Sequence, residues 1–118
     1  MRKILGNVMV AATLASIAGC DYAKVVSGTL PCSQWTEDQR TQPGSVNART
    51  EIAFAQGFFP AFYESAQKAS GNRGAVLNFP DANTTLLASM NAYCQQYPDA
   101  TITQAANDVM VDAMKLRD

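Results

Sequence analysis

The stretch that decides the fold is residues 81–98, which read DANTTLLASMNAYCQQYP. Its apolar residues recur at steps of three and four, the period of an amphipathic helix with one buried face. Asp81 or Asn83 is available as the N-cap of this helix, and Pro98 marks its end. The apolar stripe contains a cysteine, which we therefore expect to be buried, and consists of Leu86, Leu87, Met90, Tyr93, Cys94 and Tyr97.

The segment before this helix has the same period. Residues 48–69 place one apolar face at Ile52, Ala55, Phe58, Phe59, Phe62, Tyr63 and Ala66. Pro60 cannot donate a backbone hydrogen bond to the carbonyl of Gln56, so a kink or break is expected there. Gly71 is a natural helix stop. Residues 40–47 and 70–80 collect glycine, proline and polar residues and are predicted as loops.

The segment after it carries the clearest helix start in the chain. Residues 101–104 read TITQ, which is a capping box, and an apolar stripe follows at Ile102, Ala105, Ala106, Val109, Met110, Ala113 and Leu116. A short helix over residues 32–39 completes the set. No segment alternates with period two, so the predicted fold class is all-α: a small four-helix, disulfide-stapled bundle after a cleaved N-terminal signal segment.

The first twenty residues have the layout of a secretory signal: Arg2 and Lys3, an apolar run over 4–18, then small residues. The alternatives are a retained membrane helix or a buried core helix, although the run is short for a membrane span. Residues 17–20 read IAGC and resemble the lipobox of bacterial lipoproteins, which implies cleavage before Cys20 and lipidation of Cys20. The competing interpretation is ordinary cleavage after residues 16–18, which leaves Cys20 a free thiol.

The lipobox defines the expected organisation. Residues 1–19 are a signal peptide, residues 20–30 a lipidated tether and residues 31–118 the helical domain. The expected location is the bacterial periplasm, anchored to a membrane by Cys20. Of the three cysteines, acylation of Cys20 leaves Cys32 and Cys94 as a pair, and export favours a disulfide between them over two buried thiols.

The composition excludes several kinds of chemistry. The chain has no histidine, which removes the usual general base and histidine-containing metal sites. Two cysteines cannot form a thiolate zinc site, and there is no C-x-x-C motif. Asp108 and Asp112 lie four apart on one helix, where a solvated face competes with a metal or acid–base role. We expect no enzyme, no cofactor and no metal. The balance of 9 Lys and Arg against 10 Asp and Glu argues against nucleic acid.

Three motifs together resemble the HdeA/HdeB-like small periplasmic proteins: PCSQW at residues 31–35, AQGFF at 55–59 and TITQAA at 101–106, with the helix at 81–98 between them. The resemblance covers about residues 32–116. It implies an all-helical domain with one disulfide, carried here by Cys32 and Cys94. The sequence is also similar to the Tai-like immunity proteins of type VI secretion systems, which share the exported, disulfide-stapled helical plan.

The resemblance implies an acid-stress chaperone that is a dimer at neutral pH, opens when its carboxylates are protonated and binds unfolding client proteins. Without Arg2 and Lys3 the balance is 7 basic to 10 acidic side chains, or net −3, and full protonation gives about +7. The alternatives are an immunity or exclusion lipoprotein that binds an incoming toxin or phage component, and a structural accessory of an envelope complex. The candidate partner-binding residues are Trp35, Phe58, Phe59, Phe62 and Tyr63, for which core packing is the competing interpretation.

Overall fold

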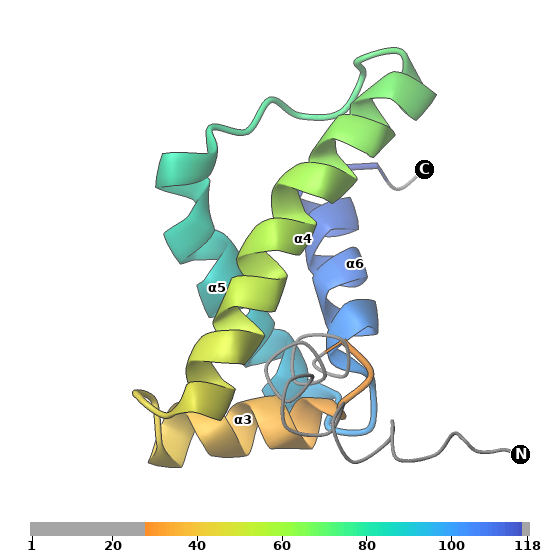
Figure 1. Cartoon of the computed structure of the whole chain (residues 1–118). Coiled ribbons are helices and arrows are strands. Elements are labelled where there is room, and N and C mark those ends of the chain that lie inside the picture. The colour runs from red at the N-terminus through yellow and green to blue at the C-terminus, as the bar shows by residue number, and fades with distance from the viewer. Residues whose placement is uncertain (1–27, 117–118) are drawn as a thin grey trace, which may run out of the picture.

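The computed structural model describes residues 28–116. The predictions on residues 1–27, including lipidation of Cys20, lie outside the described residues. Within the described range the chain forms four helices and no strand: α3 (Cys32–Thr41), α4 (Val46–Ser70), α5 (Phe79–Gln96) and α6 (Ile102–Ala113) (Figure 1). The predicted all-α class is confirmed, and so is the short first helix.

The helices are arranged around an antiparallel hairpin formed by α5 and α6. Figure 1 shows the long α4 lying across this hairpin and the short α3 crossing the foot of the molecule. α5 packs mainly against α6 and α3, and α6 also packs against α4. The hairpin is therefore covered by α4 and braced at its loop end by α3.

The core lies where the four apolar stripes meet. α6 contributes the largest share, as expected from its predicted stripe, because Ile102, Ala105, Ala106 and Met110 are fully buried. The remaining buried apolar residues come from every other helix and from the chain after α6: Cys32, Trp35, Ala48, Ala55, Phe59, Leu86, Met90, Cys94, Val109 and Met114. Helical periodicity thus predicted most of the core correctly.

The prediction for Pro60 was a kink or a break in the helix, and the break does not occur. α4 continues through Pro60 without interruption, from a Ser45 N-cap whose hydroxyl accepts a hydrogen bond from the N–H of Ala48 (3.1 Å) to the predicted stop at Gly71. Pro60 is exposed and follows Phe59, which is fully buried. Packing of the buried face offsets the one missing backbone hydrogen bond, since tertiary contacts supply most of the stability of protein helices.

α5 begins earlier than predicted, so neither Asp81 nor Asn83 is its N-cap. The helix starts at Phe79 with Asn78 as N-cap, and Pro80 lies in its first turn. The N–H groups of a first turn have no intrahelical partner, so a proline there removes nothing and its fixed φ suits the helix. Pro80 therefore opens α5 instead of closing the preceding loop.

The N-termini of α3 and α6 satisfy each other's backbone groups. Pro31, the N-cap of α3, offers no side-chain hydrogen bond. Instead the N–H of Cys32 donates to the carbonyl of Ala100 (2.7 Å), and the N–H of Ile102 donates to the carbonyl of Leu30 (2.9 Å). These bonds supply acceptors to donors that a helix start leaves unpaired, and they fix the loop between α5 and α6 against the start of α3.

Candidate functional site

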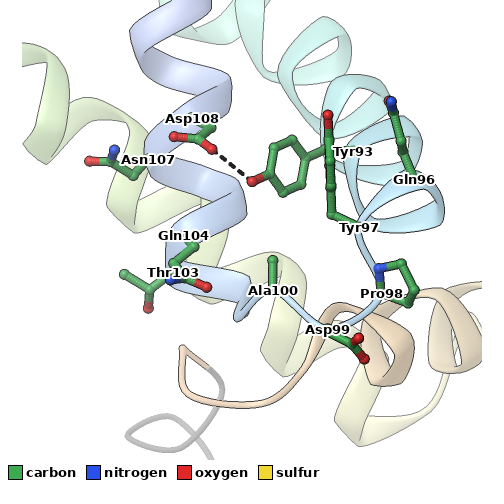
Figure 2. A pocket seen from close by; sticks show the side chains of 10 residues that line it. All are labelled: Tyr93, Gln96, Tyr97, Pro98, Asp99, Ala100, Thr103, Gln104, Asn107 and Asp108. Carbon is green, nitrogen blue, oxygen red and sulfur yellow. Dashed lines mark hydrogen bonds between the residues drawn. The ribbon is translucent and has the colours of Figure 1, made fainter.

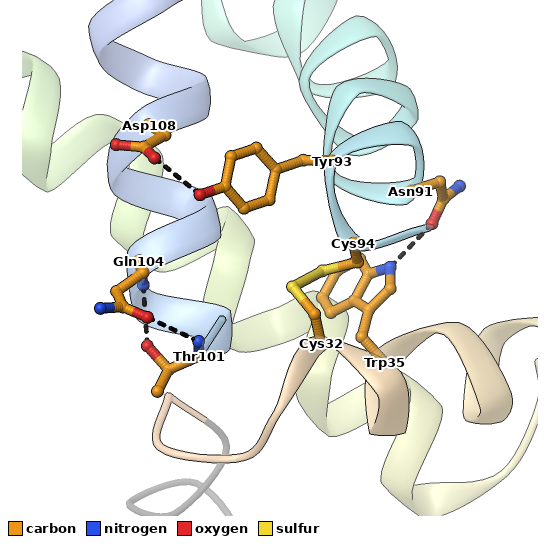
Figure 3. The surroundings of a disulfide bond; sticks show 8 residues. All are labelled: Cys32, Trp35, Asn91, Tyr93, Cys94, Thr101, Gln104 and Asp108. Carbon is orange, nitrogen blue, oxygen red and sulfur yellow. Dashed lines mark hydrogen bonds between the residues drawn. A yellow bond between two sulfur atoms is a disulfide. The ribbon is translucent and has the colours of Figure 1, made fainter. Parts of the chain in front are cut away.

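The disulfide between Cys32 and Cys94 is present, which confirms the predicted pairing. It joins the first residue of α3 to the last turns of α5, with both side chains fully buried and their Cα atoms 4.7 Å apart. Beside it, the indole N–H of Trp35 donates to Oδ1 of Asn91 (2.7 Å), a second link between the same two helices (Figure 3). The loop end of α5 is therefore held firmly.

A groove runs along the outer side of the α5–α6 hairpin. It consists of two adjoining hollows of about 690 Å³ and about 460 Å³. The larger lies at the loop end of the hairpin (Figure 2). Tyr93, Tyr97 and Asp108 line both hollows, so the two form one surface. We call this surface the α5–α6 groove.

Two tyrosines one helical turn apart form the α5 wall of the groove. The ring centroids of Tyr93 and Tyr97 are 4.7 Å apart, as expected for residues spaced by four on one helix face. The hydroxyl of Tyr93 donates to Oδ2 of Asp108 (2.7 Å) and so ties α5 to α6 across the groove. Tyr97 is 48 % exposed, which makes it the accessible aromatic side chain of this wall.

One residue of the α6 capping box, Gln104, lines the larger hollow. The predicted box is confirmed: the hydroxyl of Thr101 accepts from the N–H of Gln104 (3.0 Å), and Oε1 of Gln104 accepts from the N–H of Thr101 (2.8 Å). Because the side-chain Oε1 of Gln104 accepts from a backbone N–H at the helix start, the side chain is oriented by the fold itself. Gln104 also lines the groove.

The groove is lined by three aspartates, Asp99, Asp108 and Asp112, and by no Lys or Arg of residues 28–116. The sequence explains this: residues 74–114 contain four Asp and not one Lys, Arg or Glu. Asp108 and Asp112, which the spacing placed on one face, both lie on the groove. The hairpin is thus an acidic element of the molecule.

A second unusual site is the buried carboxyl pair of Asp38 on α3 and Glu51 on α4. Glu51 is 1 % exposed and Asp38 is 8 % exposed. Burial, and then the hydrogen bond and charge of Asp38, raise the pKa of Glu51 to about 8, against a smaller opposing effect of the amide of Gln39, which donates to Oε1 (3.3 Å). Within the described chain, Glu51 Oε2 and Asp38 Oδ2 have no hydrogen-bond partner in the structure. Burial therefore favours a protonated Glu51 beside Asp38, where α3 and α4 meet.

The predicted partner-binding aromatic residues divide into two groups. Trp35 and Phe59 are in the core, where a partner cannot reach them while the domain is folded. Phe58, Phe62 and Tyr63 are half-buried and pack against the core. The rings of Phe58 and Phe62 lie 5.9 Å apart along α4. Core packing, the competing interpretation, accounts for Trp35 and Phe59, whereas a partner-binding role for Phe58, Phe62 and Tyr63 stays a prediction.

The tyrosine wall was not predicted as a site. Tyr97 belonged to the expected buried stripe of its helix, but α5 ends at Gln96 and Tyr97 is its C-cap, so the side chain leaves the buried face. The available signal was the proline that follows, because Pro98 disfavours helical backbone at the residue before it, Tyr97. With Asp99 next in the chain, this position combines an aromatic and an acidic residue.

Two further findings concern residues 28–116 only. No three His, Cys, Asp or Glu side chains gather there in an arrangement that could hold a metal ion. No helix in this range is both long and apolar enough to cross a membrane.

No protein-family model, curated protein or solved structure matches the chain. The candidate site therefore has to be judged from its own geometry, and the resemblance to the HdeA/HdeB-like proteins stays a prediction.

Proposed function

We propose that this chain is a non-enzymatic protein-binding domain of the bacterial envelope, and that its partner protein binds in the α5–α6 groove. The observation that carries the proposal is Tyr97, an aromatic side chain 48 % exposed at the junction of two hollows. Exposed tyrosines in hollows are typical of interface anchors, because the ring contributes large contact area and the hydroxyl a hydrogen bond.

The rigidity of the groove supports this proposal. The disulfide at Cys94 is adjacent in sequence to Tyr93, and the hydroxyl of Tyr93 bonds Asp108 on the opposite helix. A binding surface that is already ordered loses little side-chain freedom when a partner docks, and therefore retains more of its contact energy as affinity. The domain is thus suited to bind in its folded state.

The envelope location rests on the lipobox and on the disulfide. A buried cystine in a small domain is typical of oxidising compartments outside the cytosol. If Cys20 is lipidated, as the lipobox predicts, Cys20→Ser moves the protein from the membrane fraction to the soluble periplasmic fraction. Equal partitioning of both proteins contradicts the anchor and leaves the groove proposal standing.

The immunity-protein hypothesis and the chaperone hypothesis require different partners. In an immunity or exclusion lipoprotein the occupant of the groove is an incoming toxin or phage component, which a domain that stays folded can bind. An acid-stress chaperone has to open instead and use surface that is now half-buried, such as Phe58 and Phe62. The groove exists on the folded domain, so it favours a folded binder.

The experiment is site-specific photo-crosslinking in cells that produce the full chain. A photo-reactive phenylalanine analogue replaces Tyr97 in one variant and Val46 in the control. Val46 is 64 % exposed at the start of α4 and does not line the groove. We expect a discrete crosslinked species from position 97 and none from position 46. No discrete species from position 97, or equal labelling from both positions, overturns the proposal.

A further inference from the structure

We propose that the last turn of α3 is a pH-operated latch, which lies closed on α4 in neutral and acidic solution and opens in alkaline solution while the first turn of α3 stays fixed to α5. The latch comprises residues 38–41. This inference concerns a movement of the folded domain and does not depend on what binds in the α5–α6 groove. It starts from the two ends of α3, which are held in different ways.

The first turns of α3 are held by links that do not titrate. The disulfide joins Cys32 to Cys94 on α5, and the indole N–H of Trp35 donates to Oδ1 of Asn91 (2.7 Å). The backbone N–H of Cys32 also donates to the carbonyl of Ala100 (2.7 Å). A disulfide, an indole, an amide and two backbone groups keep their protonation state over the range in which carboxyl groups titrate. This end of α3 therefore stays attached to α5 whatever the pH.

The last turn of α3 is held on α4 by buried side-chain groups. The amide of Gln39 donates to the carbonyl of Ala48 (3.0 Å) and to Oε1 of Glu51 (3.3 Å). Asp38 and Glu51 are both buried, and Oδ2 of the first and Oε2 of the second have no hydrogen-bond partner among the described residues. A protonated carboxyl donates a hydrogen bond that a carboxylate cannot, so a proton on Glu51 suits this pair. The residues that follow, 41–44, are all exposed and add no buried contact.

No positive charge is available to replace that proton. Burial, then the hydrogen bond and charge of Asp38, raise the pKa of Glu51 to about 8, and the amide of Gln39 opposes them. Among residues 28–116, Asp38 is the one titratable group that acts on the pKa of Glu51 from the helices packed around it. The other charged or titratable side chains of α3, α4, α5 and α6, none of which contributes, are Glu37, Arg40, Arg49, Tyr63, Glu64, Lys68, Asp81, Tyr93, Asp108 and Asp112.

Ionisation of Glu51 therefore places two negative charges in a space from which water is excluded. Burial and like charge both disfavour this state, and hydration of the two carboxylates relieves it. The last turn of α3 can separate from α4 because the loop between them, residues 42–45, contains the exposed Pro43 and Gly44, and because helix ends open at little cost. Since the pKa of Glu51 is raised in the closed state, the latch weakens as the pH rises through about 8.

The test is limited digestion of the oxidised full chain with trypsin, which cleaves after Lys and Arg. Arg40 lies in the latch, and cleavage within a helix requires local opening, so the cleavage rate reports the open population. Arg73 is exposed in the loop after α4 and is the internal reference for trypsin activity at each pH. We expect the ratio of cleavage after Arg40 to cleavage after Arg73 to rise roughly tenfold from about pH 7 to about pH 9, because the pKa of Glu51 is about 8 in the closed state.

Two variants and two probes separate the latch from other effects. Glu51→Gln cannot ionise and should keep the ratio constant. Glu64→Gln makes the same change at an exposed position of α4 and should behave as the wild-type protein. Cleavage after Lys68, in the last turn of α4, and the fluorescence of Trp35, the one tryptophan of the chain, report on the rest of the domain and should stay unchanged.

A constant ratio in the wild-type protein overturns the latch, and so does an equal rise in Glu51→Gln. A rise after Arg40 that comes with an equal rise after Lys68 and a shift of the Trp35 emission also overturns it, because the whole domain then unfolds instead of the last turn of α3. None of these results bears on the groove, whose own test is the crosslink from position 97.

Discussion

Glu51 shows how a buried acidic residue can support a fold. In water its carboxyl would be ionised at neutral pH, but on α4 it is 1 % exposed and faces a second carboxyl, Asp38. Burial disfavours the charged form, and a carboxyl neighbour disfavours it further, so Glu51 keeps its proton until about pH 8. A carboxyl whose pKa is raised in the folded state stabilises the fold fully below its unfolded pKa, and this stabilisation is lost as pH rises through the folded pKa.

Glu51→Gln tests this assignment. Glutamine donates a hydrogen bond to Asp38 at every pH, as the protonated glutamate does only below about pH 8. We expect the variant and the wild-type protein to have similar free energies of unfolding near pH 5. Near pH 9 the variant should be more stable by on the order of 3 kcal/mol, because the wild-type glutamate is then ionised. Urea denaturation at both pH values measures the difference.

Glu64→Gln is the matched control for Glu51→Gln. It makes the same change on the same helix at an exposed position, and its effect should stay within about 0.5 kcal/mol at both pH values. If the free energy of unfolding of Glu51→Gln follows that of the wild-type protein across the whole pH range, the proton assigned to Glu51 is refuted.

The roles of individual residues such as Glu51 could largely not be predicted from the sequence. Glu51 directly precedes Ile52, a stripe residue of α4, and nothing local distinguishes it from a solvated glutamate; its burial depends on how the preceding helix, α3, packs back against α4. Tyr97 was assigned to the wrong environment for the same reason, since its exposure depends on where α5 ends. Cys32 and Cys94 could be paired from the sequence because parity and export constrain cysteines without knowledge of packing.

The elements themselves follow local rules closely, and α4 illustrates this. Its N-cap serine, its helical stripe and its left-handed stop at Gly71 (φ 67°) each match a known preference of helices. Pro60 is the exception, because the burial of Phe59 overrides a local preference. The start of α5 was misplaced since a proline signals both the end of a loop and the first turn of a helix.

Replacement of glycine by alanine should have opposite effects on stability at two positions, Gly57 inside α4 and Gly71, which caps its end. Gly57 lies inside the helix, and a Cβ atom there would meet no atom within 4 Å. Gly57→Ala should therefore raise the free energy of unfolding by about 0.5–1 kcal/mol, because alanine loses less backbone entropy.

Gly71 at the end of the same helix adopts φ 67°, a left-handed conformation that strains any residue with a Cβ. Gly71→Ala should lower the free energy of unfolding by about 1 kcal/mol. Thermal denaturation of both variants is the measurement. Shifts of the same sign contradict the described end of α4.

The stability of α3 depends on the disulfide, because the helix is too short to be stable by itself. It has ten residues, too few for a stable isolated helix, and it is attached at its first residue through Cys32. Replacing both Cys32 and Cys94 by serine should lower the free energy of unfolding by about 4 kcal/mol, the chain-entropy value for a separation of 62 residues. Hydrogen exchange should then show α3 opening before α5 and α6.

Chemical denaturation of the wild-type protein with and without a reducing agent is the control for the double serine variant, and reduction should reproduce its loss of stability. A loss below about 1 kcal/mol in both experiments contradicts the role assigned to the disulfide.

At the scale of the whole molecule, the behaviour of the domain in acid depends on its carboxyl groups. The ion pair of Arg40 with Glu37 has side chains that are 68 % and 58 % exposed, where such a pair contributes at most about 1 kcal/mol. Glu51 supports the fold more strongly as the pH falls. These features favour a domain that stays closed in acid, unlike the acid-opened chaperone that the family resemblance implies.

The function of the molecule was harder to predict from the sequence than its helices or its fold class. Composition and periodicity determine the fold class because they act locally, whereas the α5–α6 groove arises from the way two helices lie side by side. The absence of basic residues from 74 to 114 is visible in the sequence, but its meaning appears only when Asp99, Asp108 and Asp112 are found to line one surface.

The central claim is that this domain binds its partner while folded, and acidification of the oxidised full chain tests it most directly. Near-UV circular dichroism, binding of an apolar dye and suppression of client aggregation are measured together from about pH 7 to about pH 3, the range in which ordinary carboxyls gain protons. We predict that the tertiary signal is retained, that dye binding does not rise and that client aggregation is not suppressed. Loss of the tertiary signal together with dye binding and suppressed aggregation at about pH 3 contradicts the account and identifies an acid-opened chaperone.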